Sequence, residues 1–118
     1  MKNILLGITT IKFNQTDEFE KELKKFAKKY RSILEDLEEF KKALHVVPEG
    51  NGKHFNVITQ TPEQKIIKAR FFCKYLKGST LRIVYAYNLQ TEEITFIEVY
   101  FKGEKENEDR RRIERYLE

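Results

Sequence analysis

The sequence predicts an α+β fold with the order β-α-α-β-β-β-α, in which a helix hairpin packs on one face of an antiparallel sheet. Two observations predict it. Apolar residues recur at helical spacing in the first half of the chain, whereas those after residue 65 alternate with a period of two. The connections between these segments are short, which favours antiparallel neighbours. A chain of 118 residues has the length of one domain, and we expect a single domain over residues 1–118.

The first half predicts one strand and two helices. The segment Ile4–Phe13 is rich in isoleucine and threonine, which is typical of a strand. Thr16-Asp17 and Ser32 with Glu35 are helix-start patterns. Each is followed by one apolar stripe, namely Phe19, Leu23, Phe26, Ala27 and Tyr30 in the first helix and Ile33, Leu37, Phe40 and Leu44 in the second.

Residues 45–64 break the helical pattern, because Pro48, Gly50, Gly52 and Pro62 forbid a long helix there. The sequence therefore predicts a loop of about 20 residues, which is long for a compact domain. Two interpretations remain open: a functional loop, or a plain crossover from the helices to the sheet.

The second half predicts three strands and a last helix. The strands are expected at Ile66–Leu76, Leu81–Asn88 and Ile94–Lys102, joined by two tight turns. The helix is expected over Glu104–Leu117, with its acidic residues first and its arginines later, as the helix dipole favours. We interpret the run of arginines at 110–112 as a solvated face.

The composition excludes several classes of protein. With 9 Phe, 6 Tyr and 40% hydrophobic residues, the chain can build a core and is not disordered. No run approaches the roughly 18 apolar residues of a membrane span, and no secretory signal is visible. One cysteine excludes an internal disulfide framework and fits the cytoplasm, and two distant histidines exclude a zinc finger. We expect no metal and no cofactor.

The net charge of +4 is unevenly distributed along the chain. Residues 65–91 contain six basic side chains and no acidic one: Lys65, Lys68, Arg70, Lys74, Lys77 and Arg82. A local positive field of this kind attracts phosphates or an acidic partner. The alternative is that these charges only keep the strands soluble.

Strand parity places many of these charges on one face. If the predicted strands pair suitably, one sheet face bears Lys68, Arg70, Lys74, Arg82, Tyr100 and Lys102. Point cations, guanidinium groups and an aromatic hydroxyl are what the binding of an RNA backbone requires. The register between the strands does not follow from the sequence, so a scattered arrangement on a solvated face remains the alternative.

At this point the chain resembles a known family, the RelE/ParE superfamily of type II toxin–antitoxin systems, in its RelE-like branch. The resemblance covers about residues 11–117. It rests on the order of elements, on Leu81-Arg82-Ile83-Val84-Tyr85, on Tyr100-Phe101-Lys102 before Lys105-Glu106-Asn107-Glu108, and on the segment from Pro48 to Phe55. No single motif in this set is invariant.

The resemblance implies a metal-independent endoribonuclease toxin that cuts mRNA on the ribosome, inhibits translation, and is neutralised by a cognate antitoxin. The RNA 2′-OH would attack the adjacent phosphorus and leave a 2′,3′-cyclic phosphate. By resemblance Arg82 stabilises the scissile phosphate, Lys68, Arg70 and Lys74 match basic positions of the preceding strand, and Tyr100 is the nearest candidate acid. Lys68 or Lys74 could act as the base if neighbouring cations lower the pKa of the amine. Further RNA contacts are expected from Lys65, Lys77 and Lys102.

The sequence departs from the family's pattern in one respect. No histidine lies on the predicted meander strands, and Glu98 is the only carboxylate there with suitable parity. An ordinary Glu/His acid–base pair is therefore missing. Two other readings stay open: a ParE-like toxin that inhibits a protein target such as DNA gyrase, and an inactive relative that binds an acidic peptide.

Overall fold

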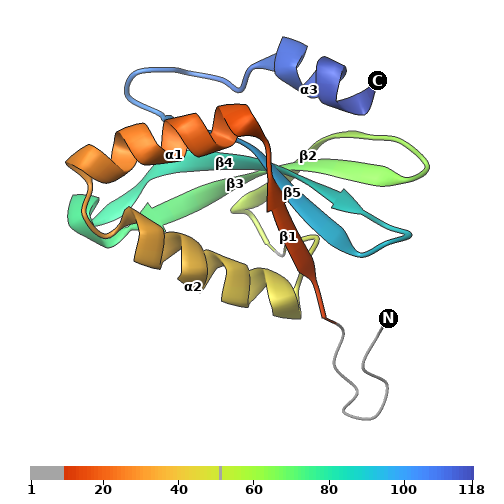
Figure 1. Cartoon of the computed structure of the whole chain (residues 1–118), viewed down its shortest axis with the longest axis horizontal. Helices are drawn as coiled ribbons and strands as arrows, with labels where there is room; N and C mark the ends of the chain where they lie inside the picture. Colours follow the sequence, from red (N-terminus) through yellow and green to blue (C-terminus); the bar gives the residue numbers. More distant parts are fainter. Residues whose placement is uncertain (1–9, 51) are drawn as a thin grey trace.

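The computed structural model describes residues 10–50 and 52–118, which form a five-stranded sheet with three α-helices (Figure 1). The elements are, in order, β1 (Lys12–Gln15), α1 (Asp17–Lys29), α2 (Ile33–Val46), β2 (Phe55–Gln60), β3 (Gln64–Cys73), the 3₁₀ turn η2 (Lys74–Leu76), β4 (Gly78–Asn88), β5 (Glu93–Phe101) and α3 (Arg110–Leu117). The α+β class expected from the sequence is confirmed. No helix in the described part of the chain is both long and apolar enough to cross a bilayer.

The strands lie in the order β1-β5-β4-β3-β2. The three hairpin-connected pairs are antiparallel, as expected, but β1 runs parallel to β5. The expectation of a purely antiparallel sheet is therefore wrong at this edge. β1 and β5 are far apart in the sequence, so no tight turn joins them and they need not run antiparallel. Of the predicted first strand Ile4–Phe13, residues 4–9 lie outside the described residues.

The predicted loop over residues 45–64 is wrong in its second half, because β2 forms there. Phe55–Gln60 pairs with β3 as the edge strand of the sheet. A tight turn at Thr61 joins the two strands, and the Thr61 hydroxyl accepts hydrogen bonds from the amides of Glu63 and Gln64, at 3.3 and 3.0 Å. Pro62 is tolerated because it lies in this turn and not in the ladder.

The helix starts agree with the sequence at α1 and α2 and differ at α3. The Thr16 hydroxyl caps α1 by accepting from the amide of Phe19 at 3.2 Å. Ser32 does precede α2, but its hydroxyl donates to the Asp36 carboxylate at 2.7 Å instead of capping the helix. The predicted last helix was too long: α3 begins at Arg110, because the Asp109 carboxylate caps the amides of residues 111 and 112.

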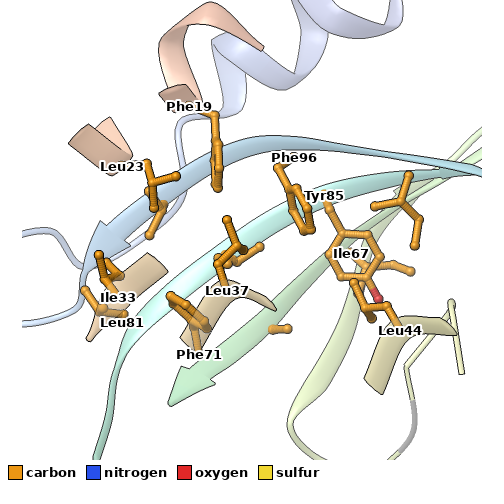
Figure 2. Packing of buried hydrophobic residues seen from close by; sticks show 14 of the residues in the cluster. Phe19, Leu23, Ile33, Leu37, Leu44, Ile67, Phe71, Leu81, Tyr85 and Phe96 are labelled. Carbon is orange, nitrogen blue, oxygen red and sulfur yellow. The ribbon is translucent and has the colours of Figure 1, made fainter. Parts of the chain in front are cut away.

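The main core lies between α1, α2 and one face of the sheet. Figure 2 shows Phe19 and Leu23 of α1, and Leu37 of α2, directed toward Phe71 and Phe96 of the strands. A larger set of strand residues shares this face with them, including Ile67, Ala69, Cys73, Leu81, Ile83 and Tyr85, all fully buried. The period-two alternation that the sequence predicts after residue 65 is confirmed over residues 67–73 of β3.

The opposite face is covered in part by α3. Ile113 packs there with Ile66, Val84, Ala86 and Ile97 in a second, smaller core. The remainder of this face carries charged and aromatic side chains, which form the candidate site.

Candidate nucleic-acid interface

The strand register brings three of the predicted site residues into one row. Arg70 of β3 lies opposite Arg82 of β4, and Arg82 in turn lies opposite Tyr100 of β5. Directly opposed residues of antiparallel strands have their Cβ atoms about 5 Å apart, so the three side chains are immediate neighbours. We call this set the Arg70–Arg82–Tyr100 row.

Solvent exposure decreases along the row, from an open end at Arg70 to a buried end at Tyr100. Arg70 is exposed, Arg82 is half-buried, and Tyr100 is only 3% exposed. Within the described part of the chain, Arg70 forms no ion pair. The Arg82 Nη1 donates to the carbonyl of Leu81 at 3.1 Å. Two like charges side by side repel each other, so the open end favours an anion that bridges both guanidinium groups.

Tyr100 closes the row. Its hydroxyl is buried and has no hydrogen-bond partner among the described residues, and the Lys105 ammonium lies 5.6 Å from its ring centroid. Burial first, and then the negative charges of Glu108 and Glu98, raise the pKa of Tyr100 to about 12, although Arg82 opposes this effect. The phenol is therefore protonated at neutral pH, but its hydroxyl is shielded in this structure.

Lys68 lies two residues before Arg70 on the same face of β3 and is paired with a carboxylate, whereas its proposed role as a base relied on neighbouring cations. Its Nζ donates to Glu108 Oε1 at 2.8 Å, and the Glu108 side chain is only 3% exposed. Burial raises the pKa of Glu108, but hydrogen bonds from Lys68, from the backbone and from Arg110 outweigh burial and lower it to about 2. Glu108 is therefore ionised and holds Lys68 in an ion pair.

Glu98 is a second buried carboxylate on this face and is 1% exposed. It accepts hydrogen bonds from Lys105 and, at 2.8 Å, from the amide of Asp109. Together, Glu98 and Glu108 attach the segment of residues 102–109 to the sheet face. Counting charges in a single stretch of sequence could not reveal Glu108 as the partner of a residue 40 positions earlier.

The remaining predicted lysines do not join the row. Lys74 lies in the 3₁₀ turn and not on the strand, and its Nζ is 3.9 Å from Glu35. Lys65 has the opposite parity and forms an ion pair with Glu49. Lys77 is in the turn before β4 with a φ of 54°, and Lys102 follows β5 and donates to the carbonyl of Glu106 at 2.6 Å. The single face proposed for six residues is therefore smaller than expected.

Arg112 was interpreted wrongly from the sequence, and Tyr85 lies away from the row. Arg112, assigned to a solvated run, is 8% exposed and donates to both carboxylate oxygens of Glu22, at 2.7 and 3.0 Å. Tyr85 belongs to the core, where its hydroxyl donates to the carbonyl of Pro48 at 3.0 Å. Neither belongs to the candidate interface. In the part of the chain that the structure describes, no three His, Cys, Asp or Glu side chains are grouped so that they could hold a metal ion.

Comparison with known proteins provides one match. No family model matches the sequence, and none of the curated proteins matches significantly. Among solved structures, the chain is similar to a chain in the crystal structure of the archaeal RelE–RelB complex from Pyrococcus horikoshii OT3, with a TM-score of 0.62 and 17% identity. The match covers 82% of this chain and 100% of that chain. The chain therefore has a RelE-like fold.

Proposed function

We propose that this chain is the toxin component of a type II toxin–antitoxin system and an mRNA endoribonuclease that acts on the ribosome. The observation that carries this proposal is the pair Arg70 and Arg82, side by side on an open sheet face of a RelE-like fold. The similar solved chain is part of a RelE–RelB complex, which supports a small antitoxin protein as the cognate partner. Action on ribosomes would place the protein in the cytoplasm.

The reaction needs three operations on one phosphodiester. The 2′-OH of the ribose loses its proton and attacks the adjacent phosphorus, the 5′ oxygen of the next nucleotide leaves with a proton, and a 2′,3′-cyclic phosphate remains. The negative charge that develops on the phosphate oxygens requires fixed positive charge nearby. Arg82 and Arg70 would supply it, because a guanidinium stays protonated and can donate two parallel hydrogen bonds.

The two proton transfers would fall to Tyr100 and Lys68. Tyr100 would protonate the leaving oxygen. Lys68 would accept the 2′ proton as a neutral amine, after it has separated from Glu108. Both roles require residues 102–109 to move, since the Tyr100 hydroxyl is buried and Lys68 is paired with Glu108. Such movement fits a toxin whose site is completed on the ribosome. Lys65, Lys74, Lys77 and Lys102 would contact phosphates farther along the RNA.

Controlled expression without an antitoxin tests this proposal. The wild-type chain should arrest growth and translation, and primer extension should map cuts in mRNA. Arg82→Ala should relieve the arrest and abolish the cuts. Arg111→Ala is the matched control, because Arg111 is an exposed arginine of α3 outside the row, and it should behave as wild type. A harmless wild-type chain, produced in folded form, would refute the proposal.

A second candidate is favoured by the buried Tyr100 hydroxyl and by the lack of a histidine on the described strands β3 to β5. On this candidate the chain inhibits a protein target such as DNA gyrase, as ParE-like toxins do, or only binds a partner. Growth arrest with intact mRNA and damaged DNA would support inhibition of a protein target such as DNA gyrase. If Arg70 or Arg82 variants lose partner binding and expression of the chain has no effect on growth, the chain only binds a partner.

A further inference from the structure

Phe72 is an exposed aromatic residue at the open end of the row. It follows Arg70 by two positions, so it has the same strand parity, and successive same-face positions are about 7 Å apart. Its side chain is 56% exposed, whereas its neighbours Phe71 and Cys73 are buried. Single exposed apolar residues are common and need no explanation. Phe72 is different because of where it lies, beside the two arginines for which phosphate binding is proposed above.

A hollow of about 220 Å³ lies next to Phe72, between the end of β3 and α2. The rings of Phe40, Phe71 and Phe72 line it, together with Asp36, Glu39 and Lys74. At this end of the sheet the ladder between β2 and β3 ends at the pair Phe55 and Ala69, and the Arg70 amide donates to the carbonyl of His54, the residue before β2, at 3.0 Å. The lining residues Phe71, Phe72 and Lys74 follow this point along the chain.

The charges around the hollow differ on its two sides. On the sheet side, Lys74 of the 3₁₀ turn lines the hollow and is exposed, and Arg70, two residues before Phe72, is an exposed cation outside the hollow. The carboxylates of Asp36 and Glu39 lie on the α2 side. An anionic group is attracted to the sheet side and repelled from the α2 side. An occupant with a phosphate at one end and a flat uncharged ring at the other matches this arrangement.

We propose that Phe72 binds a nucleobase of the RNA strand whose phosphate lies on Arg70 and Arg82. Unstacked bases of single-stranded RNA stack on exposed aromatic side chains, next to cations that hold the backbone. Phe72 then fixes the position of the strand on the sheet face, and with it the phosphate that reaches Arg82. This inference rests on the proposed function and adds a positioning residue that takes no part in proton transfer.

The test compares two synthetic oligomers at low ionic strength. One is a fluorescently labelled 2′-O-methyl RNA of eight nucleotides, which cannot be cut because it has no free 2′-OH. The other is an abasic oligomer with the same number of phosphates. The variants are Phe72→Ala, Phe72→Tyr and Arg82→Ala. Val57→Ala is the matched control, because Val57 is 53% exposed on the edge strand β2. Fluorescence anisotropy measures each affinity, and circular dichroism checks that each variant is folded.

Phe72→Ala should weaken binding of the RNA by about five-fold or more and leave binding of the abasic oligomer unchanged. Phe72→Tyr and Val57→Ala should bind both as wild type does, and Arg82→Ala should weaken both alike. If Phe72→Ala lowers the affinity for the two oligomers equally, the inference is overturned, because the ring then does not contact a base. If Phe72→Ala leaves RNA binding unchanged and shifts the chain from dimer to monomer in sedimentation, the inference is overturned in favour of an interface between copies of the chain.

The inference and the proposed function can fail separately. If Phe72→Ala binds both oligomers normally while Arg82→Ala weakens both, only the inference falls. If the wild-type chain binds neither oligomer, phosphate binding by the row is refuted and both fall.

Discussion

The ion pair between Glu108 and Lys68 stabilises the attachment of residues 102–109 to the sheet, and its strength can be measured as a function of pH. The pKa of Glu108 is about 2 in the folded chain, against 4.5 for a free glutamate. Since one pKa unit corresponds to about 1.36 kcal/mol, the ionised form adds about 3 kcal/mol to the free energy of unfolding. The Glu108 side chain is 3% exposed, but its donor Arg110 is 64% exposed, so solvent screening makes this value an upper bound.

Glu108→Gln should therefore lower the free energy of unfolding by up to about 3 kcal/mol at pH 7, measured by urea denaturation. Because the folded-state pKa is lowered, the stabilisation is complete above about pH 4.5 and is lost as the pH falls toward 2. At pH 3 the variant and wild type should differ by only about 1 kcal/mol. Glu106→Gln, at an exposed position two residues earlier, should change stability by less than about 0.5 kcal/mol. A Glu108→Gln effect that is small at pH 7, or that does not shrink toward pH 3, would refute the reasoning.

Three further predictions concern the same framework. Arg112→Met should lower the free energy of unfolding by about 2–3 kcal/mol, because the Glu22 carboxylate loses the two hydrogen bonds that Arg112 donates and keeps only the one from the Val99 amide. Adding Glu22→Gln should recover part of this loss in a urea-denaturation cycle, and strictly additive effects would contradict the pairing. Tyr85→Phe should cost about 1 kcal/mol in thermal unfolding, since the carbonyl of Pro48 loses its donor; an unchanged melting temperature would show that the bond contributes nothing. In a phenolate absorbance titration, the difference between wild type and Tyr100→Phe should appear near pH 12, and a difference near pH 10 would show that the hydroxyl is exposed.

Sequence patterns within a few residues correctly predicted helix capping at Thr16 and side-chain alternation along β3. The Thr16 cap and the alternation along β3 hold in the structure, because capping and side-chain parity are decided by a few adjacent residues. The strand β2 was missed although Val57, Ile58 and Thr59 are β-branched residues between two turns. Pro48, Gly50 and Pro62 outweighed that signal, but they limit a strand and do not prevent one.

The site depended on contacts that no local pattern contains. Parity placed Arg70, Arg82 and Tyr100 on one face, but the register that aligns them arises from pairing across β3, β4 and β5. The excess charge of residues 65–91 is partly neutralised by Glu108 and Glu49, which are distant in sequence. Arg70 and Arg82 lie directly opposite each other on this face, so the candidate interface is smaller than the charge count predicted.

The central claim is that Arg82 and Arg70 hold a phosphate that is cut by its own 2′-OH. The most direct measurement incubates the purified chain with programmed ribosomes and a defined mRNA and identifies the new RNA ends. We predict fragments that end in a 2′,3′-cyclic phosphate, with 5′-hydroxyl partners, and no such fragments with Arg82→Ala. Intact mRNA with the wild-type chain, or the same fragments with Arg82→Ala, would contradict the account.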